Sequence, residues 1–267
     1  MRKNALSGGI IVNASQGVNG VTGAVADPAL HVSAILPAYE EAEAIDWVVE
    51  RTVRALDAAC DRWEVLLVVH ASALDGTPAK AADWSRRHSR VKVVVQPPGG
   101  RGYGRALALG LEAASLPWVF LCDADGQFDP LDYPLLARAS RGVDLVAGMR
   151  SPRVDPWPRR LSAWFYNFLL RRFLGVPTRD TDCAFKLVRR EAIGGPLRFS
   201  HLADGELVAR IVGRGGRWRE VPVRHSERRG GRSQAESLPG LPRPGLVLSV
   251  LRDLRDFRRE ALGRSGR

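Results

Sequence analysis

Residues 117–130 read PWVFLCDADGQFDP, and they decide how the rest of the chain is interpreted. An apolar run from Trp118 to Cys122 stops abruptly, and polar side chains follow at every second position: Asp123, Asp125, Gln127 and Asp129. A short apolar run bounded by turn residues predicts a buried strand. A strand that ends in acidic residues delivers them to the carboxyl edge of a sheet, where open α/β folds bind ligands. The stretch therefore predicts an α/β fold with a site at that edge.

The spacing of these acidic residues indicates a divalent metal ion. Two carboxylates held close together repel each other unless a cation lies between them. Oxygen ligands of this kind suit Mg²⁺ or Mn²⁺, which proteins hold together with substrate phosphates. We expect Asp123, Asp125 and Gln127 to form the metal site. The alternative is an acidic loop in which Asp129 caps a helix that begins at Pro130, and it explains only Asp129.

The composition limits the class of protein. The 267 residues, of which 45% are hydrophobic, are enough for one large domain or for one domain with an extension. Three cysteines without metal-ligand spacing indicate a reducing compartment and no disulfide framework. No run is long and apolar enough to span a bilayer, and the first residues make a poor signal peptide. We expect a cytoplasmic protein, peripheral on the inner face of the membrane.

The charge of the chain favours anionic partners. Its formal net charge is +11 and its isoelectric point is about 10.5. Such a balance suits nucleotides, phosphorylated lipids, acidic membranes or nucleic acid. We do not expect nucleic acid as a partner, because no helix-turn-helix, zinc or RNA-binding motif accompanies the charge. A nucleotidyltransferase would also use metal-binding carboxylates on an α/β sheet, but the sequence lacks a convincing phosphate-binding start motif.

Predicted strands and helices alternate from residue 31 onwards. The predicted strands are 31–36, 63–69, 91–95, 118–122, 143–148, 185–188 and 218–223, and helical segments such as 40–60, 102–114 and 130–140 separate them. This order implies right-handed crossovers and a mostly parallel sheet flanked by helices. We divide the chain into a flexible tail (1–30), an α/β domain (31–235) and a basic C-terminal helical extension (236–267).

Several segments resemble the motifs of one enzyme family in their order and spacing. They are ILPAYEE (35–41), the glycine helix 102–110, DADGQ (123–127), GMR (148–150), DTDCAFK (180–186), EVPV (220–223) and the basic loop 228–233. Over residues 31–235 the chain is similar to the family 2 glycosyltransferases of the GT-A (Rossmann-like) fold, especially the branch of dolichol-phosphate mannose synthase. In the acceptor-side segment, Ala184 replaces the family's usual Gly.

The resemblance implies a nucleotide-sugar donor and an inverting transfer by direct displacement at the anomeric carbon. It implies Mg²⁺ or Mn²⁺ on Asp123, Asp125 and Gln127. The nucleotide-binding positions that it implies are Pro37, Tyr39, Glu41, Asp123, Arg150 and Ser233. The expected catalytic residues are Asp125, Arg228 and Asp204. A metal ion and arginines would stabilise the charge that grows on the nucleoside diphosphate as it leaves.

Asp204 is a candidate base whose role depends on the acceptor. A hydroxyl acceptor needs a base within hydrogen-bond reach, whereas a lipid phosphate is already ionised and needs none. Asp204 and Glu206, before a predicted helix, are the two candidates for this base. The alternative role for Asp204 is therefore that of a helix N-cap.

One segment departs from the family pattern. After the second strand the family usually carries Val-Asp-Asp-Gly-Ser-x-Asp-Gly-Thr, and here residues 69–77 read VHASALDGT. His70 and Ala71 thus stand where the resemblance puts two acidic residues that contact base and ribose. The loss of such a buried charged partner costs on the order of 1.5–3 kcal/mol. The donor is then recognised differently, bound weakly, or not turned over. A non-catalytic nucleotide-binding descendant is the corresponding alternative function.

The segment Trp157–Phe173 favours one class of acceptor. It contains six aromatic residues flanked by arginines, a composition typical of a membrane interface. It predicts an interfacial helix on an anionic membrane surface and a polyprenyl phosphate as acceptor. The alternatives are a core-packing helix and a soluble small-molecule hydroxyl acceptor. The C-terminal helix around Leu251–Phe257 either assists or docks on the domain. The sugar, the nucleobase and the oligomeric state are left open.

Overall fold

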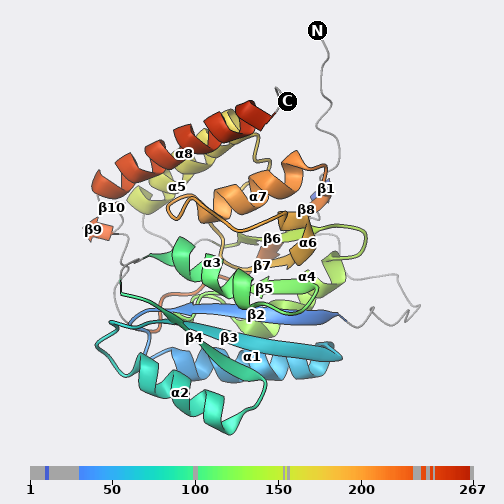
Figure 1. Cartoon of the computed structure of the whole chain (residues 1–267), viewed down its shortest axis with the longest axis vertical. Helices are drawn as coiled ribbons and strands as arrows, with labels where there is room; N and C mark the ends of the chain where they lie inside the picture. Colours follow the sequence, from blue (N-terminus) through green and yellow to red (C-terminus); the bar gives the residue numbers. More distant parts are fainter. Residues whose placement is uncertain are drawn as a thin grey trace.

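The structure is a computed structural model that describes residues 10–11, 30–98, 102–152, 154, 157–230, 236–238, 241–242 and 244–264. A mixed sheet forms its centre, and helices cover both faces of that sheet (Figure 1). The predicted fold class, a mostly parallel α/β sheet flanked by helices, is confirmed. Across the described ranges, no helix has the length and apolar character that crossing a bilayer requires.

The main sheet has eight strands in the order β1-β8-β6-β7-β5-β2-β3-β4. Their bounds are β1 Ile10–Ile11, β2 His31–Ala38, β3 Arg62–His70, β4 Val91–Gln96, β5 Trp118–Leu121, β6 Leu145–Arg150, β7 Lys186–Arg189 and β8 Trp218–Val223. All neighbours are parallel except β7, which runs antiparallel to both β5 and β6. A small hairpin joins β9 (Glu236–Leu238) and β10 (Leu241–Pro242).

The helices follow the predicted order. Their bounds are α1 Ile45–Ala59, α2 Thr77–Arg87, α3 Tyr103–Ala113, the short 3₁₀ turn η1 Pro130–Asp132, α4 Tyr133–Ala139, α5 Trp157–Leu174, α6 Arg190–Ile193, α7 Ala203–Gly213 and α8 Pro244–Arg264. Helix α8 lies against α5 at the end of the molecule opposite α1 and α2 (Figure 1). As predicted, the side chain of Asp129 caps the turn that begins at Pro130, by accepting a hydrogen bond from the Leu131 amide at 3.0 Å.

Strand β2 shows how the two faces of the sheet are covered. Successive side chains of a strand point to opposite faces. Val32, Ala34 and Leu36 pack in one core with α1 and α4. Ile35 packs in a second core with α3 and α7. Both faces of the central strands are therefore buried, which explains why their sequences are continuously apolar.

Strand β2 extends further than predicted, because Pro37 lies within it and not after it. Pairing of β2 with β5 ends at the Ile35–Leu121 pair, whereas pairing with β3 continues to the Ala38–Val69 pair. Pro37 thus lies where β2 has one neighbour, so its missing N–H removes no hydrogen bond from a central ladder.

The two chain ends partly join the domain. Within the predicted tail, Ile10–Ile11 form β1, which is parallel to β8, and the other residues before Leu30 lie outside the described ranges. Helix α8 docks on the domain. Leu254 is buried, and the Phe257 ring packs edge-on against Phe199 with a centroid distance of 5.6 Å.

The strand order also locates a crevice. The chain passes from β2 to β3 and β4 on one side of the sheet, and it then returns to place β5 on the other side of β2. Ligands of open α/β sheets bind outside the carboxyl ends of the strands at such a switch point. Here that point lies between the ends of β2 and β5.

Candidate active site

The loop that follows β5 is held in a fixed shape. The Asp125 carboxylate accepts a hydrogen bond from the Gln127 amide at 2.9 Å. Two backbone hydrogen bonds join the segment after β8 to the same loop. The Ser226 amide donates to the Gln127 carbonyl at 2.8 Å, and the Arg229 amide donates to the Asp125 carbonyl at 3.1 Å. The acidic residues after β5 and the basic residues after β8 are therefore fixed relative to each other.

Arg228 joins the two strand ends at the crevice. Its Nη1 lies 2.5 Å from Glu41 Oε1, after β2, and its Nη2 lies 2.9 Å from Asp125 Oδ2, after β5. Burial raises the pKa of Glu41 to about 7, although the Arg228 guanidinium opposes that shift. Three of the predicted site residues, from widely separated segments, thus meet at the switch point.

Asp123 lies in a strongly acidic environment. Burial, and then the carboxylates of Asp125 and Asp204, raise the pKa of Asp123 well above its ordinary value, while Arg228 and Lys186 lower it in part. Carboxylate oxygens are suitable ligands for a divalent cation, and such a cation would relieve the repulsion between these crowded carboxylates.

The fit of a metal ion requires more than these two carboxylates. Within the described part of the chain, no group of three or more His, Cys, Asp and Glu side chains could hold a metal ion. The Gln127 side-chain amide donates to the Ser226 carbonyl at 3.3 Å. Mg²⁺ and Mn²⁺ are commonly held by one or two carboxylates together with substrate phosphates. Asp123 and Asp125 fit that arrangement.

Trp47 of α1 stacks against the basic segment that follows β8, residues 224–229. The Arg229 guanidinium lies over its indole ring, 3.8 Å from the centroid, and Arg51 stacks on the same ring at 4.7 Å. Arg229 also passes directly over Gly126, which has a φ of 74°. A Cβ at Gly126 would lie 2.6 Å from Arg229 Cδ, so only glycine fits this turn.

A second polar cluster lies near the acidic loop. Lys186 Nζ, with no exposed surface, lies 2.5 Å from Asp204 Oδ1. It also donates to the Cys183 carbonyl. Burial, and then the Asp204 carboxylate, raise the pKa of Tyr103 well above its ordinary value. Desolvation by the surrounding protein, and then Asp204, raise the pKa of Asp182 to about 6.

Asp204 is not the N-cap of its helix. Helix α7 begins at Ala203, its N-cap is Leu202, and Asp204 lies in the first turn with its carboxylate on Lys186. The N-cap alternative is therefore wrong. The buried lysine determines where the Asp204 carboxylate points.

Comparison with known proteins assigns the family. The model of glycosyl transferase family 2 matches residues 33–194, a span that runs from within β2 to beyond β7 and includes the acidic loop. The chain belongs to glycosyl transferase family 2. The family predicted from the motifs is confirmed.

The curated relatives of this family 2 glycosyltransferase share one printed function. Undecaprenyl-phosphate 4-deoxy-4-formamido-L-arabinose transferase of Salmonella choleraesuis is 29% identical over 213 residues, which cover 78% of this chain. The same transferase of Salmonella paratyphi B matches with the same identity and coverage. This agrees with the predicted branch. The matched region is 64% of the length of these relatives.

Solved structures confirm the GT-A fold. Glucosyl-3-phosphoglycerate synthase of Mycobacterium tuberculosis, in complex with Mn²⁺, uridine diphosphate and phosphoglyceric acid, superposes with a TM-score of 0.62 at 20% identity. The match covers 84% of this chain and 78% of that one. The complex of the same enzyme with Mn²⁺, UDP-glucose and phosphoglyceric acid gives a TM-score of 0.58 at 18% identity.

The remaining predicted site residues of the family 2 chain have other surroundings. Arg150 makes a bidentate pair with Asp180, with Nε–Oδ2 and Nη2–Oδ1 distances of 2.8 and 2.6 Å, and so ties the end of β6 to the loop before β7. Pro37 lies within β2, and the Tyr39 ring packs edge-on against His70. Ser233 lies outside the described residues.

Sequence reasoning missed the roles of Lys186 and Trp47. Lys186 had a signal, because a lysine inside an otherwise apolar predicted strand requires a buried partner. Nothing in the sequence pattern distinguishes Trp47, since its stack with Arg229 joins segments far apart in the chain.

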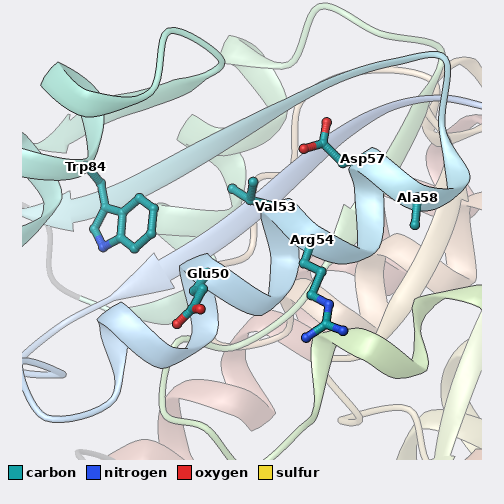
Figure 2. A pocket seen from close by; sticks show the side chains of 6 residues that line it. All are labelled: Glu50, Val53, Arg54, Asp57, Ala58 and Trp84. Carbon is teal, nitrogen blue, oxygen red and sulfur yellow. The ribbon is translucent and has the colours of Figure 1, made fainter.

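A pocket on the outer side of α1 is separate from this site. Figure 2 shows its lining residues on α1 and α2: Glu50, Val53, Arg54, Asp57, Ala58 and Trp84. Asp57 is engaged by the Trp63 indole at 3.0 Å and by Arg90 at 3.2 Å. The reactive groups lie at the strand ends and not in this pocket.

Proposed function

We propose that this protein is a metal-dependent inverting glycosyltransferase that moves a sugar from a nucleotide-sugar to a polyprenyl phosphate. The observation that carries the proposal is the bridge from Arg228 to Glu41 and Asp125 at the switch point. It combines a cation for a diphosphate with carboxylates for a divalent metal ion. The family and the printed function of the curated relatives support the same assignment.

The residues of the site have separate roles in the proposed reaction. Asp123 and Asp125 would hold Mg²⁺ or Mn²⁺, which supplies positive charge to the leaving diphosphate. Arg228 supplies a second positive charge on the same side of the crevice. Arg228 is positioned by Glu41 and by the Arg229–Trp47 stack, so little reorganisation is needed when negative charge develops.

Replacing Asp125 by alanine tests the metal role. We expect Asp125→Ala to abolish both sugar transfer and Mn²⁺-dependent binding of nucleotide, because it removes one of two metal-binding carboxylates and an anchor of Arg228. Turnover and calorimetric titration measure these effects. Asp129→Asn is the matched control, since Asp129 pairs with Arg51 at the outer end of the same loop. Unchanged turnover in Asp125→Ala refutes the metal role.

The acceptor proposal rests on the exposed apolar side chains of the neighbouring helices α5 and α8. On α5 the residues Ala163, Asn167 and Leu170 point inward and are buried. The opposite face exposes Trp157, Leu161, Trp164, Phe165 and Phe168, and α8 adds Val247, Leu248 and Leu251. Exposed arginines on the same two helices include Arg171, Arg172 and Arg252. Aromatic side chains beside arginines suit an anionic membrane surface, which would hold a polyprenyl phosphate. The proposal places the protein on the cytoplasmic face of the membrane.

A soluble hydroxyl acceptor is the second candidate, and the position of Asp204 favours it. The carboxylate is buried, lies close enough to Asp123 to raise its pKa, and is held by Lys186. Asp204→Asn separates the two acceptors. With a phosphate acceptor we expect turnover to fall by less than about tenfold, because no base is needed. With a hydroxyl acceptor the loss should be about 10²–10⁴-fold.

A further inference from the structure

His70 ends β3 and has one ring nitrogen fully engaged. Only 2% of the residue is exposed. Its Nδ1 lies 3.1 Å from the Ser72 amide nitrogen and 2.9 Å from the Ser72 hydroxyl. A backbone N–H can only donate, so Nδ1 is the acceptor and the proton of the neutral ring lies on Nε2.

The Nε2–H group of His70 is buried and unsatisfied. Within the part of the chain that the structure describes, Nε2 has no hydrogen-bond partner. A buried donor without a partner costs folding free energy, and native structures rarely keep one unless a ligand or an ordered water satisfies it.

The position of His70 identifies the class of ligand. The imidazole packs edge-on against Tyr39, with ring centroids 5.5 Å apart, and Tyr39 lies two residues before Glu41, the partner of Arg228. Strand β3 is the neighbour of β2 on the side away from β5. A nucleotide whose diphosphate lies at Arg228 and Asp125 therefore has its nucleoside end beside β3 if it extends across the end of β2.

We propose that His70 selects the nucleobase of the donor by donating a hydrogen bond from Nε2 to an accepting ring nitrogen on the Watson–Crick edge of the base. This inference rests on the proposed function. Cytosine N3 and adenine N1 are such acceptors, whereas uracil N3 and guanine N1 carry a hydrogen and would oppose a second donor. Ala71, the next residue, offers no side-chain acceptor to compensate. The site therefore prefers a cytosine or adenine base.

The test compares matched bases. We measure calorimetric binding of CDP against UDP, and of ADP against GDP, with Mn²⁺. We expect the wild type to bind CDP or ADP about tenfold tighter than its N–H counterpart. His70→Asp should reverse the order, because a carboxylate accepts from an N–H. His70→Leu is the second variant, in case the aspartate variant does not fold. It fills the same buried space with an apolar side chain and should bring the ratio close to one.

His88→Gln is the matched control. His88 precedes β4 and so lies at the amino ends of the strands, whereas His70 lies at a carboxyl end. His88 also has a buried ring nitrogen without a partner among the described residues. It should leave the base preference unchanged. Equal binding within both base pairs by the wild type, or an order that His70→Asp and His70→Leu leave intact, overturns the inference. If no nucleoside diphosphate binds with Mn²⁺, the proposed function itself is refuted, and this inference with it.

Discussion

Glu64 shows how a single buried carboxylate connects β2, β3 and β4. Its Oε1 accepts hydrogen bonds from the Ser33 hydroxyl at 2.7 Å and from the Ser115 amide and hydroxyl at 2.8 Å, and Lys92 lies 2.7 Å from Oε2. Burial alone would raise the pKa of Glu64. The hydrogen bonds from Lys92, Ser115 and Ser33 outweigh it and hold the pKa at about 2.

We expect Glu64→Gln to lower the free energy of unfolding by about 1–3 kcal/mol at neutral pH, because it removes a charged acceptor from a satisfied network. The pKa of Glu64 is depressed from an ordinary 4.5. Its contribution is therefore complete above about pH 4.5 and is lost as the pH falls towards 2. Urea titrations at several pH values measure it. The exposed Glu112→Gln should show neither effect, and a pH-independent difference for Glu64→Gln would contradict the pKa shift.

Among the helices, two glycines have opposite roles in packing. A Cβ at Gly110 of α3 would lie 2.4 Å from Ile35 Cγ2 and 3.2 Å from Val68 Cγ2. A Cβ at Gly213 of α7 would meet nothing within 4 Å. Gly110 is thus required for the close approach of α3 to the sheet, whereas Gly213 is not needed for packing.

The same substitution should therefore change stability in opposite directions at these glycines. Alanine gains about 1 kcal/mol of helix propensity over glycine. At Gly110 a clash with two core side chains costs more than that gain, so Gly110→Ala should destabilise the fold by about 1–2 kcal/mol. Gly213→Ala should be neutral or stabilise it by up to about 1 kcal/mol. Urea midpoints of the two variants measure the difference, and shifts of the same sign would contradict the packing of α3.

The order of the elements was predictable, but their pairing was not. Apolar runs and turn residues located the strands from β2 to β6 and the helices between them. The antiparallel position of β7 between β5 and β6 has no signature in its four residues, because strand direction depends on distant partners. The end of β2 was misplaced for the same reason, since only the missing neighbour after Ile35 makes Pro37 acceptable.

At the scale of the whole molecule, the candidate site was predictable in parts. Composition and motifs identified Asp123, Asp125, Glu41 and Arg228 as separate residues. The pairing of Arg228 with Glu41 joins positions 187 residues apart, and no local pattern encodes such a contact. The pairing of Arg150 with Asp180 could not be predicted from the sequence either, although each residue belongs to a recognised motif.

The exposed apolar face of α5, beside α8, leads to a prediction for the whole molecule. We expect Trp164→Glu with Phe168→Glu to weaken binding to anionic vesicles by about a hundredfold or more, because each buried aromatic side chain contributes about 1.5–3 kcal/mol. Vesicle flotation measures it. Leu135→Glu is the control. Leu135 is 41% exposed, and its helix, α4, packs on the other face of the sheet. Binding that the double variant leaves intact excludes this face as the membrane contact.

The bridge made by Arg228 has a consequence for the order in which the site comes into being. The chain emerges from the ribosome with Glu41 first, then Asp125, and with Arg228 last of the three. Until that arginine arrives, the two carboxylates have no cationic partner from the basic segment, and Trp47 has no Arg229 to stack on. A nascent chain can therefore pair β2 to β5 early, yet the diphosphate crevice closes only after Arg228 has emerged.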